Sequence, residues 1–193
     1  MERRSVGEPD SRLNLAPSGL DRADGDPRSR AEAEPFESFY SREFARLLAL
    51  ARALVGTAIA EDVVQESLFV AYRKWDAIGQ MRSPAGYVHG IVLHKAVSAA
   101  RRRTRERQVW GRFCAQRVAH VEELPAESSR FWDQVRMLPR RQAQVVALHY
   151  ALDLPVAEVA QVLDCAEGTV KVHLHRARQS LAATFAPLHG EST

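Results

Sequence analysis

The sequence contains few residues of the types that mark disulfide-rich, zinc-binding or aromatic-rich β proteins. Among 193 residues there are two cysteines, Cys114 and Cys165, and no Cys/His set has metal-ligand spacing. We therefore expect two free buried thiols, with no disulfide and no structural zinc. Aromatic residues make up only 7% of the chain, whereas hydrophobic residues make up 46% and are mainly Ala, Val and Leu. This composition favours helices over sheets.

The sequence also lacks the features of membrane proteins and enzymes. It has no apolar run long enough to cross a bilayer and no signal peptide, which predicts a cytoplasmic protein without membrane insertion. No Ser/His/Asp set, phosphate loop or metal cluster stands out. His173 and His175 are two residues apart, so on a helix they point about 200° apart. We expect no enzyme activity, no cofactor and no metal.

Charge is unevenly distributed along a chain whose net charge is only +3. Residues 1–35 have six Arg against eight Asp or Glu, and they hold four of the nine prolines and no aromatic residue. This segment is predicted to be a disordered tail. The densest basic cluster is "RRRTRER", residues 101–107, with five Arg and one Glu. Such a cluster is typical of a nucleic-acid surface or a solvated end.

Apolar periodicity predicts an all-α protein of two small helical domains joined by a flexible linker. The first helix is predicted to begin at Pro35 and to end at Gly56. Thr57 caps a second helix, which has an acidic first turn. Residues 76–82 form a loop, and Pro84 begins a third helix. Prolines 139 and 155 open later helices. The predicted units are a tail at 1–35, a first domain at 36–107, a linker at 108–128 and a second domain at 129–186.

The stretch "VAEVAQVLDCAEGTVKVHLHRA", residues 156–177, has the spacing of a helix-turn-helix motif. The first helix has an apolar face formed by Val156, Val159, Ala160 and Leu163. The second helix has an apolar stripe formed by Val170, Leu174, Ala177 and Leu181. The second helix would then expose a basic face suited to the DNA major groove. The alternative is an ordinary helical hairpin with a solvated surface.

Residues 138–181 resemble region 4 of the extracytoplasmic-function sigma factors of bacterial RNA polymerase. The matching residues are Leu138-Pro139, Glu158-Val159-Ala160, Gly168-Thr169-Val170-Lys171 and His175-Arg176-Ala177-Arg178. The resemblance implies that the last helix binds the minus-thirty-five promoter element. Its expected contacts are Gly168, Lys171, Val172, His175 and Arg176, with Gly168 letting the backbone approach a phosphate.

Residues 60–75, "AEDVVQESLFVAYRKW", resemble region 2 of the same family. Asp62, Gln65, Glu66 and Phe69 fall on one helical stripe, apart from the core stripe of Ala60, Val64, Leu68, Ala71 and Trp75. The resemblance implies that the first stripe docks on the clamp helices of the large subunit of core RNA polymerase. It also implies promoter DNA as a partner. Because family members are often held inactive by an anti-sigma factor, such a partner is a further expectation.

The third helix corresponds to the segment that handles the minus-ten element in this family. Tyr87 is either a base platform or a core aromatic, and Ile91, Leu93 and Val97 are expected in the core. The expected strand and phosphate contacts are His94, Lys95, Arg101, Arg102 and Arg103. The sequence departs from the family at Gly90, His94 and Ser98, and Gly90 should weaken the helix by about 1 kcal/mol relative to Ala.

A second interpretation is a conventional helix-turn-helix transcription regulator whose N-terminal half is a sensor or dimerisation domain. The stripe at Asp62 and the arginine cluster do not favour it, because a sensor domain needs neither.

Overall fold

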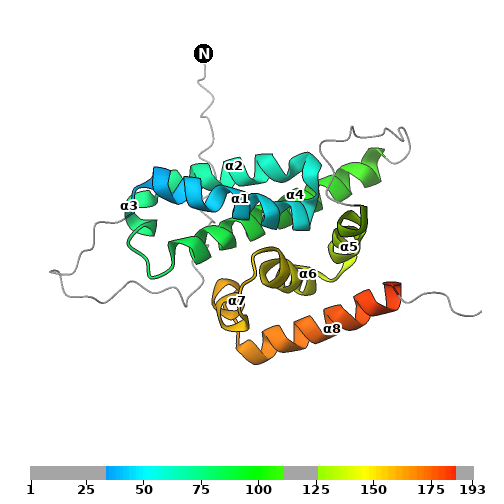
Figure 1. Cartoon of the computed structure of the whole chain (residues 1–193). Helices are drawn as coiled ribbons and strands as arrows, with labels where there is room; N and C mark the ends of the chain where they lie inside the picture. Colours follow the sequence, from blue (N-terminus) through cyan, green and yellow to red (C-terminus); the bar gives the residue numbers. More distant parts are fainter. Residues whose placement is uncertain (1–33, 111–125, 186–193) are drawn as a thin grey trace, which may run out of the picture.

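The computed structural model describes residues 34–110 and 126–185, and its helices form two groups (Figure 1). The N-terminal helix group consists of α1 (Phe36–Val55), α2 (Thr57–Arg73), α3 (Trp75–Ile78) and α4 (Pro84–Trp110). The C-terminal helix group consists of α5 (Ala126–Met137), α6 (Arg140–Val146), the π-helix η1 (Ala147–Ala151), α7 (Val156–Leu163) and α8 (Glu167–Phe185). The prediction of an all-α fold is confirmed.

The boundary between α1 and α2 depends on one glycine. Gly56 has a φ of +79°, which residues with a side chain rarely adopt, and its N–H donates to the carbonyl of Arg52. The sequence prediction was wrong about the start of α2, because Thr57 is the first helical residue and makes no side-chain cap. The first turn of α2 also contains no acidic residue, since Glu61 and Asp62 lie one turn later.

Residues 76–82 were predicted as a loop, but their first part continues from Trp75 into the helical turn α3. Tertiary packing stabilises this turn. The Trp75 ring lies 4.6 Å from that of Phe39, its Nε1–H donates to the carbonyl of Glu34 at 2.8 Å, and Ile78 is buried. Trp75 itself is half-buried, whereas the other members of the α2 core stripe are buried as predicted.

Helix α4 is apolar over a wider face than predicted. Ile91 and Leu93 are buried, but Val97 is only half-buried, whereas Val92 and Ala96 are buried. The reason is that α4 packs against α1 and α2 and also against α7. The helix extends to Trp110, and α5 begins at Ala126, so both ends of the predicted linker 108–128 are helical.

The helix that was predicted to begin at Pro139 has two parts. Pro139 precedes α6 as its N-cap, as Pro155 does for α7, and residues 147–151 widen into the π-helix η1. A π turn adds a residue to the usual helical repeat, which local periodicity does not reveal. After η1 the chain turns at Asp153, with a φ of +53°, and His149 Nδ1–H donates to the carbonyl of Leu154 at 2.8 Å.

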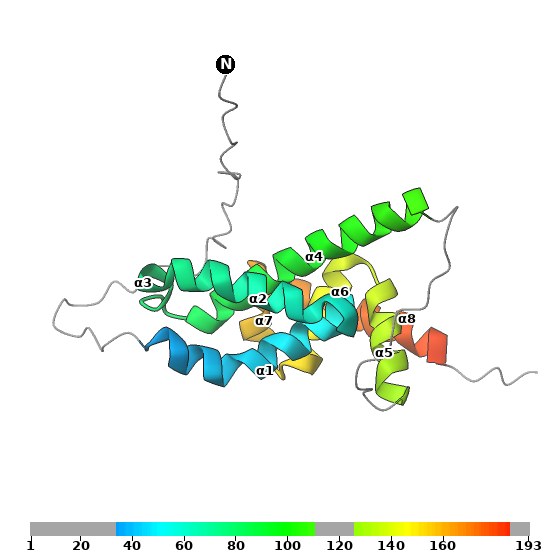
Figure 2. The ribbon, with the colours of Figure 1, turned by 90° about the horizontal axis from the view of Figure 1, so that it is seen from above.

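The two helix groups lie side by side, as both views of the ribbon show (Figures 1 and 2). Helix α1 contacts η1 and α5, and α4 contacts α7. The predicted disordered tail, the centre of the predicted linker and Cys114 lie outside the described residues. Cys165 is free as predicted, but it is half-buried rather than buried.

Candidate nucleic-acid interface

Helices α7 and α8 form the predicted helix-turn-helix. Helix α7 ends at Asp164, whose left-handed conformation (φ 50°, ψ 58°) reverses the chain, and Cys165 N–H donates to the carbonyl of Ala160 at 3.0 Å. This is the usual way to end a helix, and an aspartate tolerates it better than most residues with a side chain. The N–H of Thr169 donates to the carbonyl of Ala166 at 2.9 Å and starts α8.

Helix α8 has sharply distinct faces. All four residues of its predicted apolar stripe are buried. The predicted DNA-contacting residues are all exposed: Gly168, Lys171, Val172, His175 and Arg176. Val172 is 47% exposed on the same face of the helix. An exposed apolar residue between Lys171 and Arg176 can contact thymine methyl groups, and the cations can contact guanine edges or phosphates.

Two other polar residues of α8 are less available for DNA. Arg178 Nε–H donates to the Tyr150 hydroxyl at 2.9 Å, so a contact within the C-terminal helix group orients it. His173 is half-buried and lies off the exposed face.

The predicted minus-ten residues on α4 differ in their surroundings. His94 and Arg102 are exposed, and Tyr87 is half-buried and packs against the core. Lys95 Nζ lies 2.8 Å from Glu66 Oε2 on α2. The side chains of Arg101 and Arg103 lie outside the described residues. Tyr87 therefore has at least a packing role.

The predicted docking stripe on α2 is exposed along its length. Asp62, Gln65, Glu66 and Phe69 all face outward, and Phe69 is 61% exposed. Sequence reasoning missed Tyr72, which is 59% exposed and lies one turn beyond Phe69. The sequence contained a signal for it, because Tyr72 follows Phe69 by three residues and therefore lies on the same face of the helix. Two exposed aromatic rings on one face of a helix are typical of a protein-binding surface.

A buried ionic cluster, which the sequence did not reveal, joins α1 to α4. Glu43 is 5% exposed, and its carboxylate oxygens lie 3.1 Å from Arg42 Nε and 3.7 Å from both Arg46 Nε and His89 Nε2. The interaction with His89, assisted by Arg42 and Arg46, outweighs desolvation and lowers the pKa of Glu43 to about 2. The cluster borders a cleft of about 530 Å³ between α1, α4 and α7.

The described residues, 34–110 and 126–185, contain neither a metal-binding cluster nor a membrane-spanning helix. Within these ranges no group of three or more His, Cys, Asp or Glu side chains is arranged to hold a metal ion. Of the helices described there, none has the length and apolar character needed to cross a membrane.

Two family models match the chain, and their ranges follow the two helix groups. The model described as sigma-70 region 2 matches residues 39–106, and the model described as sigma-70, region 4 matches residues 128–181. The first range contains the α2 stripe and most of α4, and the second contains the helix-turn-helix. Together the two matches span well over half of the chain.

Curated relatives match across both helix groups. The ECF RNA polymerase sigma factor SigL of Mycobacterium tuberculosis is 32% identical over 164 residues, which covers 82% of this chain and 93% of the relative. The RNA polymerase sigma-E factor of Streptomyces avermitilis is 28% identical over 150 residues, covering 77% of this chain and 84% of the relative.

Solved structures share the fold. The sigma factor RpoE of Bartonella quintana, solved in complex with the anti-sigma factor NepR, superposes with a TM-score of 0.63 at 26% identity, covering 77% of this chain and 94% of that one. CnrH, solved with the cytosolic domain of CnrY, has a TM-score of 0.58 at 21% identity, covering 77% and 86%.

Proposed function

This chain belongs to the extracytoplasmic-function sigma factors of bacterial RNA polymerase, and on that premise we propose how its surfaces divide the work of promoter recognition. As a sigma factor it is not an enzyme: it binds core polymerase and promoter DNA and directs the polymerase to promoters. The alternative of a conventional regulator with a sensor domain has no place for a region 2 match over residues 39–106.

Helix α8 is the recognition helix for the minus-thirty-five element. The observation that carries this assignment is the separation of its buried stripe from its exposed basic face. Lys171 and Arg176 bind guanine edges or phosphates, and Val172 and His175 bind base edges or thymine methyl groups. Gly168, exposed in the first turn of α8, lets a phosphate approach the positive end of the helix.

A binding titration tests the assignment. Arg176→Ala is measured against promoters altered by one base pair at a time. If Arg176 is bidentate to guanine, the variant loses about 1–3 kcal/mol on the wild-type promoter, and the loss shrinks when that guanine is changed. Arg178→Ala is the matched control, since Tyr150 orients Arg178, and it should cause no base-specific loss. No loss on any sequence from Lys171→Ala, His175→Ala and Arg176→Ala would remove α8 from the DNA.

The exposed stripe of α2 is the surface that docks on the clamp helices of the large polymerase subunit. Asp62, Glu66 and Gln65 supply polar contacts, and Phe69 supplies an apolar anchor of the kind that dominates protein interfaces. Tyr72, at the end of the same exposed row, extends this anchor.

Docking is tested with Asp62→Arg and Phe69→Ala, each assayed for binding to core polymerase. Both side chains are exposed, so both variants should fold and lose binding by at least about tenfold. Glu37→Arg, on the exposed side of α1, is the charge-matched control and should bind normally. Wild-type binding by a folded double variant would contradict the assignment.

Helix α4 and the residues before it handle the minus-ten element. His94, Lys95 and the arginines at 101–103 contact the strand and its phosphates, and Tyr87 borders that path while packing on the core. The ion pair between Lys95 and Glu66 joins this surface to the docking stripe. Clamp binding at Glu66 would release Lys95 for the strand.

Regulation by a protein inhibitor is part of this proposal, and it is supported by the solved relative RpoE, whose structure contains an anti-sigma factor. We place the protein in the cytoplasm, because core polymerase and promoter DNA are there. Affinity purification of the tagged chain from its own host tests for an inhibitor. A stoichiometric partner that blocks binding to core polymerase supports this part of the proposal, and recovery of polymerase alone contradicts it.

A further inference from the structure

A group of exposed aromatic rings lies where α1 begins and α2 ends (Figure 1). Tyr40 on α1 is 42% exposed, and Phe69 and Tyr72 on α2 are 61% and 59% exposed. The half-buried ring of Phe36 joins the two helices, with its centroid 5.1 Å from that of Tyr72 and 6.4 Å from that of Tyr40. We call Tyr40, Phe69 and Tyr72 the aromatic patch. Exposed apolar groups gathered in this way mark a binding surface.

The residues that precede α1 are tethered beside the aromatic patch. The carbonyl of Glu34 accepts a hydrogen bond from Trp75 Nε1 at 2.8 Å, and its carboxylate pairs with Arg42. The ring of Trp75 lies 5.3 Å from that of Phe36, between centroids. These contacts fix Glu34 next to the patch, so the chain before residue 34 starts from there.

The sequence before Glu34 complements the aromatic patch. All leucines among residues 1–33 fall within "LNLAPSGL", residues 13–20, which we call the leucine segment. It is followed by "DRADGD", residues 21–26, with three Asp against one Arg. On α2 the charged residues between Phe69 and Trp75 are Arg73 and Lys74, both exposed. The Arg73 guanidinium lies 6.0 Å from the centroid of the Phe69 ring. An apolar segment with an acidic end thus matches an aromatic patch with cations at one end.

The order of the two segments fits the order of the two surfaces. Counting back from Glu34, the acidic residues come first, and Arg73 and Lys74 are the cations nearest to Trp75 on α2. The leucines come next, and Phe69 lies further along α2. Six helical residues from Trp75 to Phe69 span about 9 Å, at about 1.5 Å per residue. The 14 residues that follow Leu20, ending at Glu34, can span up to about 46 Å, so the tether is long enough.

Tethering makes a weak contact sufficient. A short linker holds the segment that it carries at an effective concentration on the order of 1 mM near its binding site. A contact with a Kd of about 1 mM is therefore half occupied within one chain, whereas the same contact between separate molecules would be negligible at micromolar protein.

We propose that the leucine segment docks on the aromatic patch, with Asp21, Asp24 and Asp26 pairing with Arg73 and Lys74, and that it thereby competes with core polymerase for α2. The competition rests on the proposed docking role of the α2 stripe, but docking of the leucine segment is measured without polymerase. A covered patch lowers the apparent affinity for polymerase in proportion to the fraction of chains that remain uncovered.

Site-specific photocrosslinking on the full chain measures docking. The photoreactive residue p-benzoylphenylalanine replaces Leu15, and the crosslinked peptides are identified by mass spectrometry in the absence of polymerase. The crosslinks should fall on the peptides that contain Tyr40 or Phe69 and Tyr72. The same photoreactive residue in place of Val6 is the matched control, because Val6 is an aliphatic residue outside the leucine segment. It should not enrich these peptides.

A charge exchange tests the acidic end. Asp21→Lys, Asp24→Lys and Asp26→Lys together should reduce the crosslink yield from position 15 at least about threefold. Adding Arg73→Glu and Lys74→Glu to the same chain should restore the yield, because opposite charges then meet again. A general effect on folding would not be reversed by a second set of substitutions. Failure of the second set to restore the yield would overturn the pairing.

Competition is measured as the affinity of core polymerase for the full chain. Leu13→Ser, Leu15→Ser and Leu20→Ser together should raise the apparent affinity at least about threefold, as expected if about two thirds of wild-type chains are covered. Val6→Ser is the control and should bind as wild type does.

Two further results would overturn the proposal. Crosslinks from position 15 that match those from position 6, or that fall outside the aromatic patch, would overturn the docking. An unchanged polymerase affinity of the triple serine variant would overturn the competition. Failure of the proposed α2 stripe would appear separately: Phe69→Ala would then lose the crosslink from position 15 and yet bind polymerase as wild type does.

Discussion

Replacing Glu43 by glutamine tests whether the buried ionic cluster stabilises the fold. The carboxylate is 5% exposed and lies among Arg42, Arg46 and His89. Its pKa falls from an ordinary value of 4.5 to about 2. A shift of this size corresponds to about 3 kcal/mol, at 1.36 kcal/mol per pKa unit. Glu43→Gln keeps the shape of the side chain but removes the charge, so it should lower the free energy of unfolding at neutral pH by up to that amount.

The direction of the pH dependence follows from the lowered pKa. The folded state binds the Glu43 proton more weakly than the unfolded state, so the carboxylate contributes its full stability above about pH 5 and loses it as the pH falls toward 2. Urea unfolding of wild type and Glu43→Gln should therefore differ most at pH 6–7. The difference should shrink steadily between about pH 4.5 and pH 2.

An exposed carboxylate supplies the control. Glu61→Gln, on the surface of α2, should unfold within about 0.5 kcal/mol of wild type across the same pH range. A difference between wild type and Glu43→Gln that stays constant from pH 7 to pH 3 would refute the reasoning, because it would show packing rather than ionisation as its origin. Equal stability at pH 7 would refute it too.

Three further outcomes are expected. Gly90→Ala should raise the free energy of unfolding by about 1 kcal/mol in urea titrations, because a Cβ there would meet nothing within 4 Å; a destabilised variant would contradict the geometry of α4. Gly168→Ala should also stabilise α8, since a Cβ there would meet nothing within 4 Å. It should nevertheless weaken binding to minus-thirty-five DNA if the backbone approaches a phosphate. A variant with both higher stability and higher DNA affinity would contradict that phosphate contact. Replacing the three arginines at 101–103 by Ala should reduce the slope of promoter affinity against salt by up to about three and leave the preferred sequence unchanged; a changed minus-ten preference would mean that they touch bases.

The faces of individual helices were predictable because helical periodicity is a local property. Val170, Leu174, Ala177 and Leu181 recur at spacings of three and four, and all are buried. The same rule separated the exposed stripe containing Asp62 from the buried face of α2. Neither result required knowledge of what covers the helix, since an amphipathic helix buries its apolar stripe against some partner.

The Glu43 cluster was not predictable in the same way. A glutamate between Arg42 and Arg46 on an amphipathic helix has the pattern of a solvated surface residue. Glu43 is buried only because α4 brings His89 beside it, from 46 positions further along the chain. The π-helix η1 was missed for a related reason, because tertiary contacts rather than sequence repeat select a π turn.

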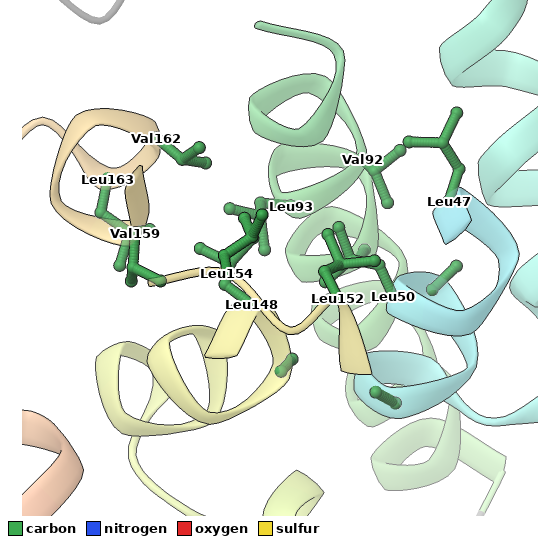
Figure 3. Close-up of a cluster of buried hydrophobic side chains, with 14 of the residues drawn as sticks. Leu47, Leu50, Val92, Leu93, Leu148, Leu152, Leu154, Val159, Val162 and Leu163 are labelled. Carbon is green, nitrogen blue, oxygen red and sulfur yellow. The ribbon is translucent and has the colours of Figure 1, made fainter. Parts of the chain in front are cut away.

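The all-α class, the helix-turn-helix and the exposed residues of α2 and α8 follow from short-range spacing and chain-breaking residues, which are local properties of the sequence. Which surface covers each remaining apolar residue depends on how the helices pack in three dimensions. Leu93 on α4 and Leu154 after η1 are both buried, and their periodicity does not say which surface covers them. In the structure they lie against each other, so each is covered by a residue of the other helix group (Figure 3). The hydrophobic effect is non-directional, so an apolar residue favours being covered by any apolar surface. The particular surface that covers it is selected by shape and by a few directional contacts, such as the hydrogen bonds from Arg46 to the carbonyl of Leu152 and from Arg136 to the carbonyl of Arg52.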